Sequence, residues 1–156
     1  MIIIMTVGWF YESQSQTTTL YFIRHAEKTN SSSNPELSEE GIQRALKWAA
    51  FFEKIPITVF YTTLTQRTQM TCSYIATTKQ KEMIFYEASR FSIEEIYKKH
   101  LGQTILIVGH SNTIPKYINT FLGSEIYPLL DENNFGSLYT LKIEEGKVTH
   151  DLVVYN

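Results

Sequence analysis

The chain has 156 residues, of which 43% are hydrophobic and 19% charged, and its formal net charge is −2. This length predicts one domain with a sizeable core, and the composition excludes a disordered chain. The small negative charge gives no general attraction to nucleic acid or anionic membranes. The single Cys72 excludes an internal disulfide framework. No apolar run approaches the roughly 20 residues that span a bilayer.

The first residues allow two interpretations. Residues 1–10 form a short apolar run and residues 12–19 are polar and small, as in a secretory signal peptide. A basic leading segment and a clear A-x-A cleavage site are missing. We therefore expect residues 1–16 to be an N-terminal arm or a signal-peptide remnant, and residues 17–156 to form the domain. The localisation stays open between cytoplasmic and, on the remnant interpretation, exported.

A buried strand is predicted over Thr17–Ile23, whose residues are β-branched, aromatic or aliphatic. It ends abruptly at Arg24 and His25. Open α/β sheets bind ligands at the carboxyl ends of their strands, so charged residues there suggest a site. The guanidinium of Arg24 suits phosphate oxygens, and His25 is a possible nucleophile or general base near neutral pH.

A helix is predicted to begin after the N-cap Ser38 and to stop before Pro56, followed by a second buried strand over Ile57–Tyr61. The expected apolar face of this helix consists of residues at helical spacing: Ile42, Ala45, Leu46, Ala49 and Phe52.

The next helix is predicted over Leu64–Thr78, with Leu64 towards the core. Arg67 lies in its first turn, where the helix dipole disfavours a cation. A bound anion would offset this cost, although an Arg67 on the surface would need no explanation. A short third strand is predicted over Glu82–Tyr86, and Glu87 follows it directly.

The clearest buried strand is Thr104–Val108, which runs into Gly109 and His110. His110 thus stands between a strand end and a predicted helix over Thr113–Leu122, a common ligand-facing position. Further elements complete the pattern: a helix over Ser92–Leu101 and a hairpin at the far edge of the sheet, with strands at Ser137–Ile143 and Lys147–Val153.

This alternation predicts an α/β fold with a mainly parallel central sheet flanked by helices on both faces, in three α/β/α layers. The carboxyl ends of parallel strands share one edge of the sheet. Two histidines, two arginines and one carboxylate should therefore converge there: Arg24, His25, Arg67, Glu87 and His110. Such a pocket suits a dianionic phosphoryl group, and nothing in it requires a metal or another cofactor.

Four ordered segments carry a family resemblance, and together they cover most of the chain from residue 17. They resemble the signatures of the histidine phosphatase superfamily, in the branch of phosphoglycerate mutases and small SixA-like phosphohistidine phosphatases. The segments are LYFIRHAEK at the first strand, LSEEGIQRA at Leu37–Ala45, FYTTLTQRTQMTC at Phe60–Cys72 and ILIVGHSNTIP at Ile105–Pro115. The resemblance implies a phosphoglycerate mutase-like fold. Ala26 replaces the commoner Gly of the first signature.

The resemblance implies that His25 is the phosphorylated nucleophile and that Arg24, Arg67 and His110 bind the phosphoryl group, with Ser111 as a further substrate contact. The proton donor is less defined. Glu87 stands where related enzymes place this acid, so we predict that it has this role. Two carboxylates on the next helix are the alternatives, Glu94 and Glu95.

The leading prediction is a metal-independent phosphatase that hydrolyses a phosphomonoester or protein phosphohistidine through a phosphohistidine intermediate. Its expected partner is a phosphorylated small molecule or phosphoprotein, and the chain is expected to be a monomer. A mutase-like phosphotransferase would use the same pocket. The resemblance implies that such mutases have longer chains with insertions that enclose the substrate, whereas the loop Thr29–Glu36 is short. A non-catalytic phosphate-binding module on the same fold is the third possibility, which predicts loss of the nucleophile or of a phosphate-binding Arg.

Overall fold

The computed structural model describes residues 16–155. The predicted N-terminal arm or signal-peptide remnant lies outside the described residues, apart from its last residue. The strands of the described part are β1 (Thr18–Arg24), β2 (Val59–Thr62), β3 (Met83–Phe85), β4 (Thr104–Gly109), β5 (Ser137–Glu144) and β6 (Lys147–Val154). Its helices are α1 (Glu39–Phe52), α2 (Gln66–Thr78), the 3₁₀ turn η1 (Ala88–Arg90), α3 (Ile93–Lys99) and α4 (Ile114–Leu122).

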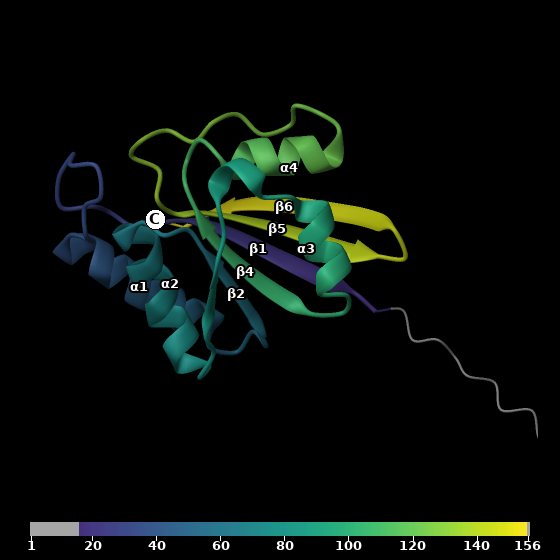
Figure 1. The fold of residues 1–156 in the computed structure, drawn as a ribbon, viewed down its shortest axis with the longest axis horizontal. Coiled ribbons are helices and arrows are strands. Elements are labelled where there is room, and N and C mark those ends of the chain that lie inside the picture. Colours follow the sequence, from purple (N-terminus) through teal and green to yellow (C-terminus); the bar gives the residue numbers. More distant parts are fainter. Residues whose placement is uncertain (1–15, 156) are drawn as a thin grey trace, which may run out of the picture.

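The strands of the described residues form one six-stranded sheet in the order β3-β2-β4-β1-β5-β6. The first four in this order run parallel, β5 pairs antiparallel with β1, and β6 pairs antiparallel with β5 to form a hairpin at the far edge. This confirms the predicted fold class and the place of the hairpin. Since β1 and β4 are central neighbours, their carboxyl ends lie side by side at the same edge (Figure 1).

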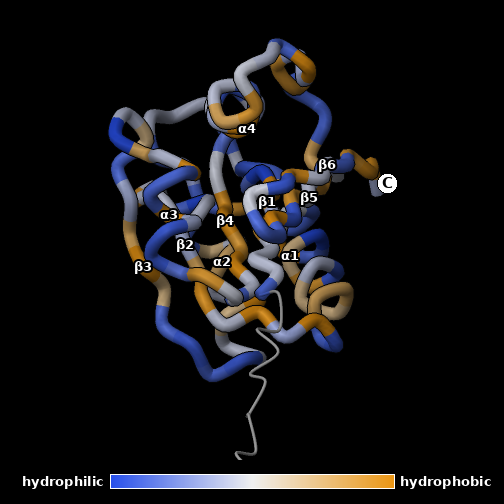
Figure 2. Tube along the Cα trace, turned by 90° about the vertical axis from the view of Figure 1, so that its right-hand side faces the viewer, coloured by the Kyte–Doolittle hydropathy of each residue, from blue (hydrophilic) through white to orange (hydrophobic). Residues whose placement is uncertain are grey.

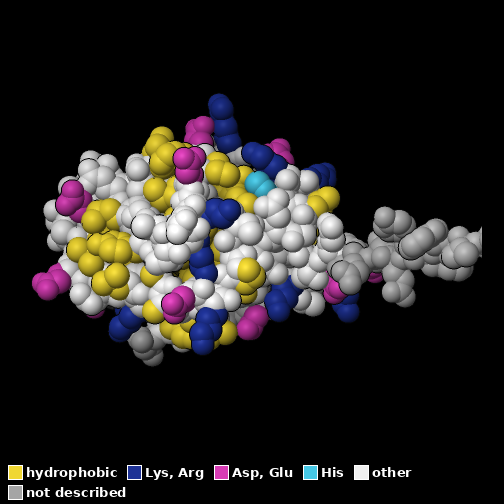
Figure 3. Space-filling model, turned by 90° about the horizontal axis from the view of Figure 1, so that it is seen from below, with side chains coloured by type: hydrophobic (Ala, Val, Ile, Leu, Met, Phe, Trp, Pro, Cys, Tyr) yellow, Lys and Arg dark blue, Asp and Glu magenta, His cyan; other side chains and the backbone are white. Residues whose placement is uncertain are grey.

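Helices cover both faces of the sheet, as predicted. Successive strand residues point to opposite faces, so Phe22 packs in one hydrophobic cluster with α4, and Ile23 packs in another with α1 and α2. Figure 2 shows the hydrophobic tube of β4 in the interior, between these helix layers. Among the described residues, no helix has the length and apolar character needed to cross a membrane. On the face in Figure 3, cationic and anionic side chains are interspersed.

Two predictions about helix faces are wrong. Leu46 was expected in the apolar face of α1, but it is 44% exposed, and Trp48 is buried instead. Leu64 was expected at the start of α2 facing the core, but α2 begins at Gln66 and Leu64 is 70% exposed. Leu46 lies one helical step from the buried Ala45, where an apolar pattern alone does not separate the edge of a face from its centre. Leu64 precedes the helix, so helical spacing does not govern its burial.

The start of α1 is packed directly onto the chain that leaves β1. Ser38 caps this helix by accepting a hydrogen bond from the Gly41 amide, as predicted for an N-cap. A Cβ atom on Gly41 would lie 2.1 Å from the backbone oxygen of Glu27. Only glycine allows this approach, so α1 supports the backbone that follows His25.

Candidate active site

His25 and His110 lie at the carboxyl ends of two neighbouring parallel strands. Arg24 at the end of β1 is paired in register with Gly109 at the end of β4, and the His25 amide donates to the Gly109 carbonyl over 3.0 Å. The residues that follow each strand are therefore adjacent, and the two imidazole rings lie 5.5 Å apart between centroids. The structure thus brings together the two histidines that the sequence places at strand ends.

The hydrogen bond of His25 defines which ring nitrogen is free. Its Nδ1 lies 2.8 Å from the Ala26 carbonyl oxygen, which can only accept, so Nδ1 carries the proton and Nε2 keeps a lone pair. Burial, together with the positive charge of Arg24 and Arg67, lowers the pKa of His25 to about 3. The imidazole is therefore neutral at neutral pH, as a nucleophile must be.

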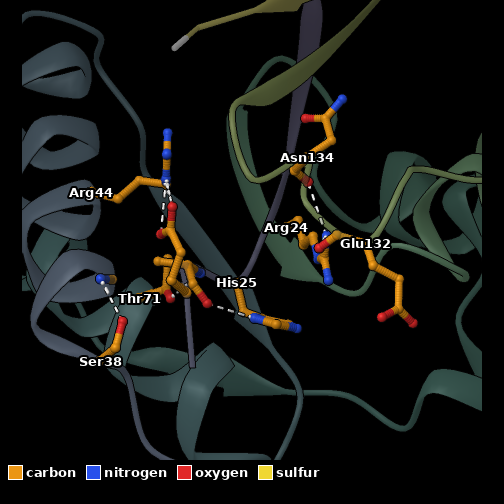
Figure 4. A network of polar contacts seen from close by, with 10 residues as sticks. Arg24, His25, Ser38, Arg44, Thr71, Glu132 and Asn134 are labelled. Atoms are coloured by element: carbon orange, nitrogen blue, oxygen red, sulfur yellow. Dashed lines mark hydrogen bonds and ion pairs between the residues drawn. The ribbon is translucent and has the colours of Figure 1, made fainter. Parts of the chain in front are cut away.

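Arg24 is 5% exposed and is anchored by one side of its guanidinium. Its Nη1 donates to the backbone carbonyls of Asp131, Glu132 and Asn134, at 3.1, 2.8 and 3.0 Å. These carbonyls belong to the loop between α4 and β5, and Figure 4 shows this loop above Arg24, on the side away from α1. The Nε atom is buried without a partner among the described residues, so the Nε edge of the fork remains available for a ligand.

Arg67 occupies the first turn of α2, as predicted, and this turn is tied to the nucleophile. The Thr71 hydroxyl donates to the Arg67 carbonyl and accepts from the Ala26 amide, at 2.7 and 3.0 Å. The Nη1 of Arg67 is buried and has no hydrogen-bond partner among the described residues. Burial lowers the pKa of Arg67 below its ordinary value. A buried unpaired donor is costly, so an acceptor is expected there.

A chain of threonine hydroxyls orients His110. Thr68 donates to the backbone carbonyls of Thr63 and Thr65, so its oxygen is left to accept the Thr63 hydroxyl proton at 2.8 Å. The Thr63 oxygen then accepts from Nε2 of His110 at 3.1 Å. Burial and the charge of Arg67 lower the pKa of His110 to about 4. Neutral His110 thus carries its proton on Nε2, where it is a donor.

Ser111 and Glu87 make contacts with other residues of the described chain. The backbone carbonyl of Ser111 accepts from the Leu130 amide at 3.3 Å, and its side chain is half-buried. Glu87 follows β3 at the same edge of the sheet, as predicted. Its carboxylate is 64% exposed, accepts from the Ser89 hydroxyl and lies 3.3 Å from Arg90 Nε. The carboxylate of Glu87 therefore contacts these two neighbours.

Phe135 was not predicted as a site residue. Its ring lies 4.1 Å from the guanidinium carbon of Arg24 and 6.1 Å from the His25 ring, measured to ring centroids. No local sequence pattern marks this residue, which lies in the loop between α4 and β5. Cys72, by contrast, is fully buried in the core, and burial raises the pKa of its thiol to about 12, so the thiol is not a reactive group.

The described residues contain no group of three or more His, Cys, Asp and Glu side chains placed to hold a metal ion. Residues 20–90, which include β1, α1, β2, α2 and β3, match the model of the histidine phosphatase superfamily (branch 1). This part of the chain is therefore similar to the histidine phosphatase superfamily (branch 1). A search of curated proteins gives no match.

The fold is similar to those of several solved structures. A mutant phosphoserine phosphatase from Entamoeba histolytica in complex with phosphoserine is 19% identical, with a TM-score of 0.70 over 85% of this chain and 94% of that one. The alpha-ribazole phosphatase from Shigella flexneri is 14% identical, with a TM-score of 0.72 over 88% and 96%. A protein assigned as the phosphohistidine phosphatase SixA from Agrobacterium tumefaciens is 14% identical, with a TM-score of 0.65 over 88% and 98%.

Proposed function

We propose that this chain is a member of the histidine phosphatase superfamily and a metal-independent phosphatase that works through a phosphohistidine on His25. The observation that carries the proposal is the state of the His25 ring. Its Nδ1 proton is committed to the Ala26 carbonyl, and its pKa of about 3 keeps Nε2 unprotonated. A buried, neutral and oriented imidazole at the end of a central strand is suited to attack phosphorus.

The two arginines support the binding of a dianionic phosphoryl group. Arg24 Nε and Arg67 Nη1 are buried donors without partners in the described chain, and both guanidiniums lie close enough to His25 to lower its pKa. A phosphoryl group offers several acceptor oxygens and a charge of about −1.5 to −2. Charge-assisted bonds from both arginines would satisfy these donors and neutralise the ligand. This supply of positive charge makes a metal ion unnecessary.

His110 would supply a further hydrogen bond to the bound group. Its Nε2 proton points to the Thr63 hydroxyl at 3.1 Å, which is an ordinary neutral acceptor. A phosphoryl oxygen carries negative charge and accepts more strongly, so it would compete for this proton. Because burial keeps His110 neutral, it would act as a donor without adding another positive charge beside His25.

The proposed reaction has two displacements. His25 Nε2 forms a bond to phosphorus as the bond to the leaving oxygen breaks, and that oxygen takes a proton from an acid. Water then attacks the phosphohistidine, the N–P bond breaks, and Nε2 regains its lone pair as inorganic phosphate leaves. Both arginines and His110 would bind the phosphoryl oxygens throughout, and stabilise them most where the charge is redistributed.

Glu87 stays the predicted proton donor. Its carboxylate is exposed and paired with Arg90. Among the alternatives, a hydrogen bond from Lys98 lowers the pKa of Glu94, which makes Glu94 a weaker acid catalyst near neutral pH. This argues against Glu94 as the proton donor.

We propose a phosphomonoester or a protein phosphohistidine as substrate. The similar structures bear the names of enzymes for phosphoserine, alpha-ribazole phosphate and phosphohistidine, which supports a phosphatase without selecting one substrate. The short loop after β1 is closed at its base, where Lys28 bridges to Leu37 and the Thr29 amide donates to the Glu36 carbonyl. A loop pinned in this way is suited to a site that accepts large phosphorylated molecules.

Turnover of His25→Ala tests the proposal. With p-nitrophenyl phosphate and a panel of phosphoesters and phosphohistidine proteins, this variant should lose activity while its circular dichroism spectrum stays that of the wild type. His150→Ala is the matched control, because His150 lies in β6 with Tyr127 as its hydrogen-bond partner. Retention of a near-normal rate by His25→Ala would overturn the proposal.

A further inference from the structure

Phe135 touches both members of the pair that ends β1. The guanidinium carbon of Arg24 lies 4.1 Å from the ring centroid of Phe135, and the His25 ring lies 6.1 Å from it at an interplanar angle of 57°. A guanidinium within about 6 Å of an aromatic face is attracted by the ring quadrupole, most strongly where water is excluded. Arg24 is 5% and His25 4% exposed, so the contact lies in such an environment.

The backbone around Phe135 is fixed on both sides. Before it, the Asp131, Glu132 and Asn134 carbonyls accept from Arg24 Nη1. After it, the Gly136 carbonyl accepts from the Tyr155 amide at 2.8 Å. A Cβ atom on Gly136 would lie 1.7 Å from the Tyr155 carbonyl oxygen, so the loop is seated closely against the end of β6. The ring is therefore held in place rather than resting on the surface by chance.

The same ring borders a second space. A hollow of about 310 Å³ is lined by Phe135 together with Arg44, Asp131 and Tyr155, among others, whereas His25 does not line it. Phe135 thus lies next to the buried imidazole and also lines this hollow. We expect truncation of the ring to give water in the hollow a route to His25.

We propose that Phe135 is a positioning residue that holds the Arg24 guanidinium with its Nε edge available to the phosphoryl group and shields His25 from water. The role of Phe135 in turnover rests on the proposed function. The shielding of His25 is independent of that function, because it concerns the protonation of the imidazole in the absence of substrate. The charged or titratable groups that face His25 are Arg24, Arg67 and His110, and those that face Arg24 also include Glu27, Asp131 and Glu132. Loss of the ring leaves all of them in the chain.

The test compares three variants at this position with a control. Phe135→Ala removes the ring, Phe135→Leu keeps apolar volume without the aromatic face, and Phe135→Tyr keeps both. Phe51→Leu is the matched control, since it removes a 37% exposed ring on α1. The first readout is the protonation midpoint of His25, measured by NMR of the imidazole without substrate. The second is kcat/KM for p-nitrophenyl phosphate as a function of pH.

For Phe135→Ala, water reaching His25 should raise its midpoint by about one pH unit or more, and the acid limb of kcat/KM should move upward by the same amount. The value of kcat/KM at neutral pH should fall by about 3- to 30-fold as Arg24 loses its support. Phe135→Leu should keep the low protonation midpoint of His25 but show most of this decrease in kcat/KM. Phe135→Tyr should resemble the wild type in both measurements.

An unchanged His25 midpoint in Phe135→Ala, with kcat/KM within twofold of the Phe51→Leu control, would overturn the inference. If Phe135→Ala does not fold, the comparison of kcat/KM between Phe135→Leu and Phe135→Tyr tests the inference. Equal kcat/KM for these two variants would contradict the role of the ring. If the wild type hydrolyses no phosphoester, the proposed function fails, while the NMR midpoints still decide whether Phe135 shields His25.

Discussion

Replacement of Arg67 by Lys gives a sharp test of the phosphate pocket. The Nη1 of Arg67 is a buried donor without a partner, and Arg67 is held beside Ala26 through Thr71. In the transition state its planar fork should make two charge-assisted bonds, worth about 1.5–3 kcal/mol each. Loss of both in Arg67→Ala, about 3–6 kcal/mol, lowers kcat/KM by about 10²- to 10⁴-fold. Lysine reaches one oxygen at most, so Arg67→Lys should lose about 10- to 100-fold.

The assay is kcat/KM for p-nitrophenyl phosphate at pH 7, with thermal unfolding measured in parallel. Arg67→Ala should keep the wild-type unfolding midpoint or exceed it, because it removes a buried donor that no residue of the described chain satisfies. The control is Arg90→Lys, whose parent side chain is 83% exposed and should leave kcat/KM unchanged. An Arg67→Lys enzyme within twofold of the wild type would show that Arg67 does not bind the phosphoryl group.

Three other predictions follow from the same site. Free histidine binds a proton near pH 6.5, whereas the folded pKa values of His25 and His110 are about 3 and about 4, so the unfolded state binds more protons below 6.5. The free energy of unfolding in urea should therefore fall from pH 6.5 to 4, and a rise would contradict the burial of neutral histidines. Activity should resist EDTA and be inhibited by vanadate, and rescue of an EDTA-treated enzyme by a divalent ion would refute the metal-independent mechanism. Glu87→Gln should slow an alkyl phosphate by about 10²-fold but p-nitrophenyl phosphate much less, because only a poor leaving group needs the proton; equal slowing would transfer the role to another carboxylate.

The central cluster could be predicted because it follows from strand ends. Arg24, His25 and His110 each come directly after or at the end of an apolar run, and parallel pairing of β1 with β4 is enough to bring them together. Arg67 was predicted from its unusual place in the first turn of α2. These inferences need only local patterns and the topology of βα units.

The surroundings of the cluster could not be predicted in this way. The contacts of Arg24 with the loop at Asp131–Asn134 join residues more than 100 positions apart, and that loop has no periodicity. The burial of Phe135 against Arg24 depends on how Gly136 packs against Tyr155, which no sequence pattern shows. In the case of Glu87, the position was read correctly, but its pairing with the exposed Arg90 depends on the turn η1.

The most direct measurement is the location of the phosphoryl group on the enzyme. Wild-type protein is mixed with labelled substrate, quenched within milliseconds in base, digested and sequenced by tandem mass spectrometry. We predict an acid-labile, base-stable phosphoramidate on His25, present in His150→Ala and absent from His25→Ala. Turnover without any such adduct in rapid-quench samples, or an adduct on another residue, would contradict the account.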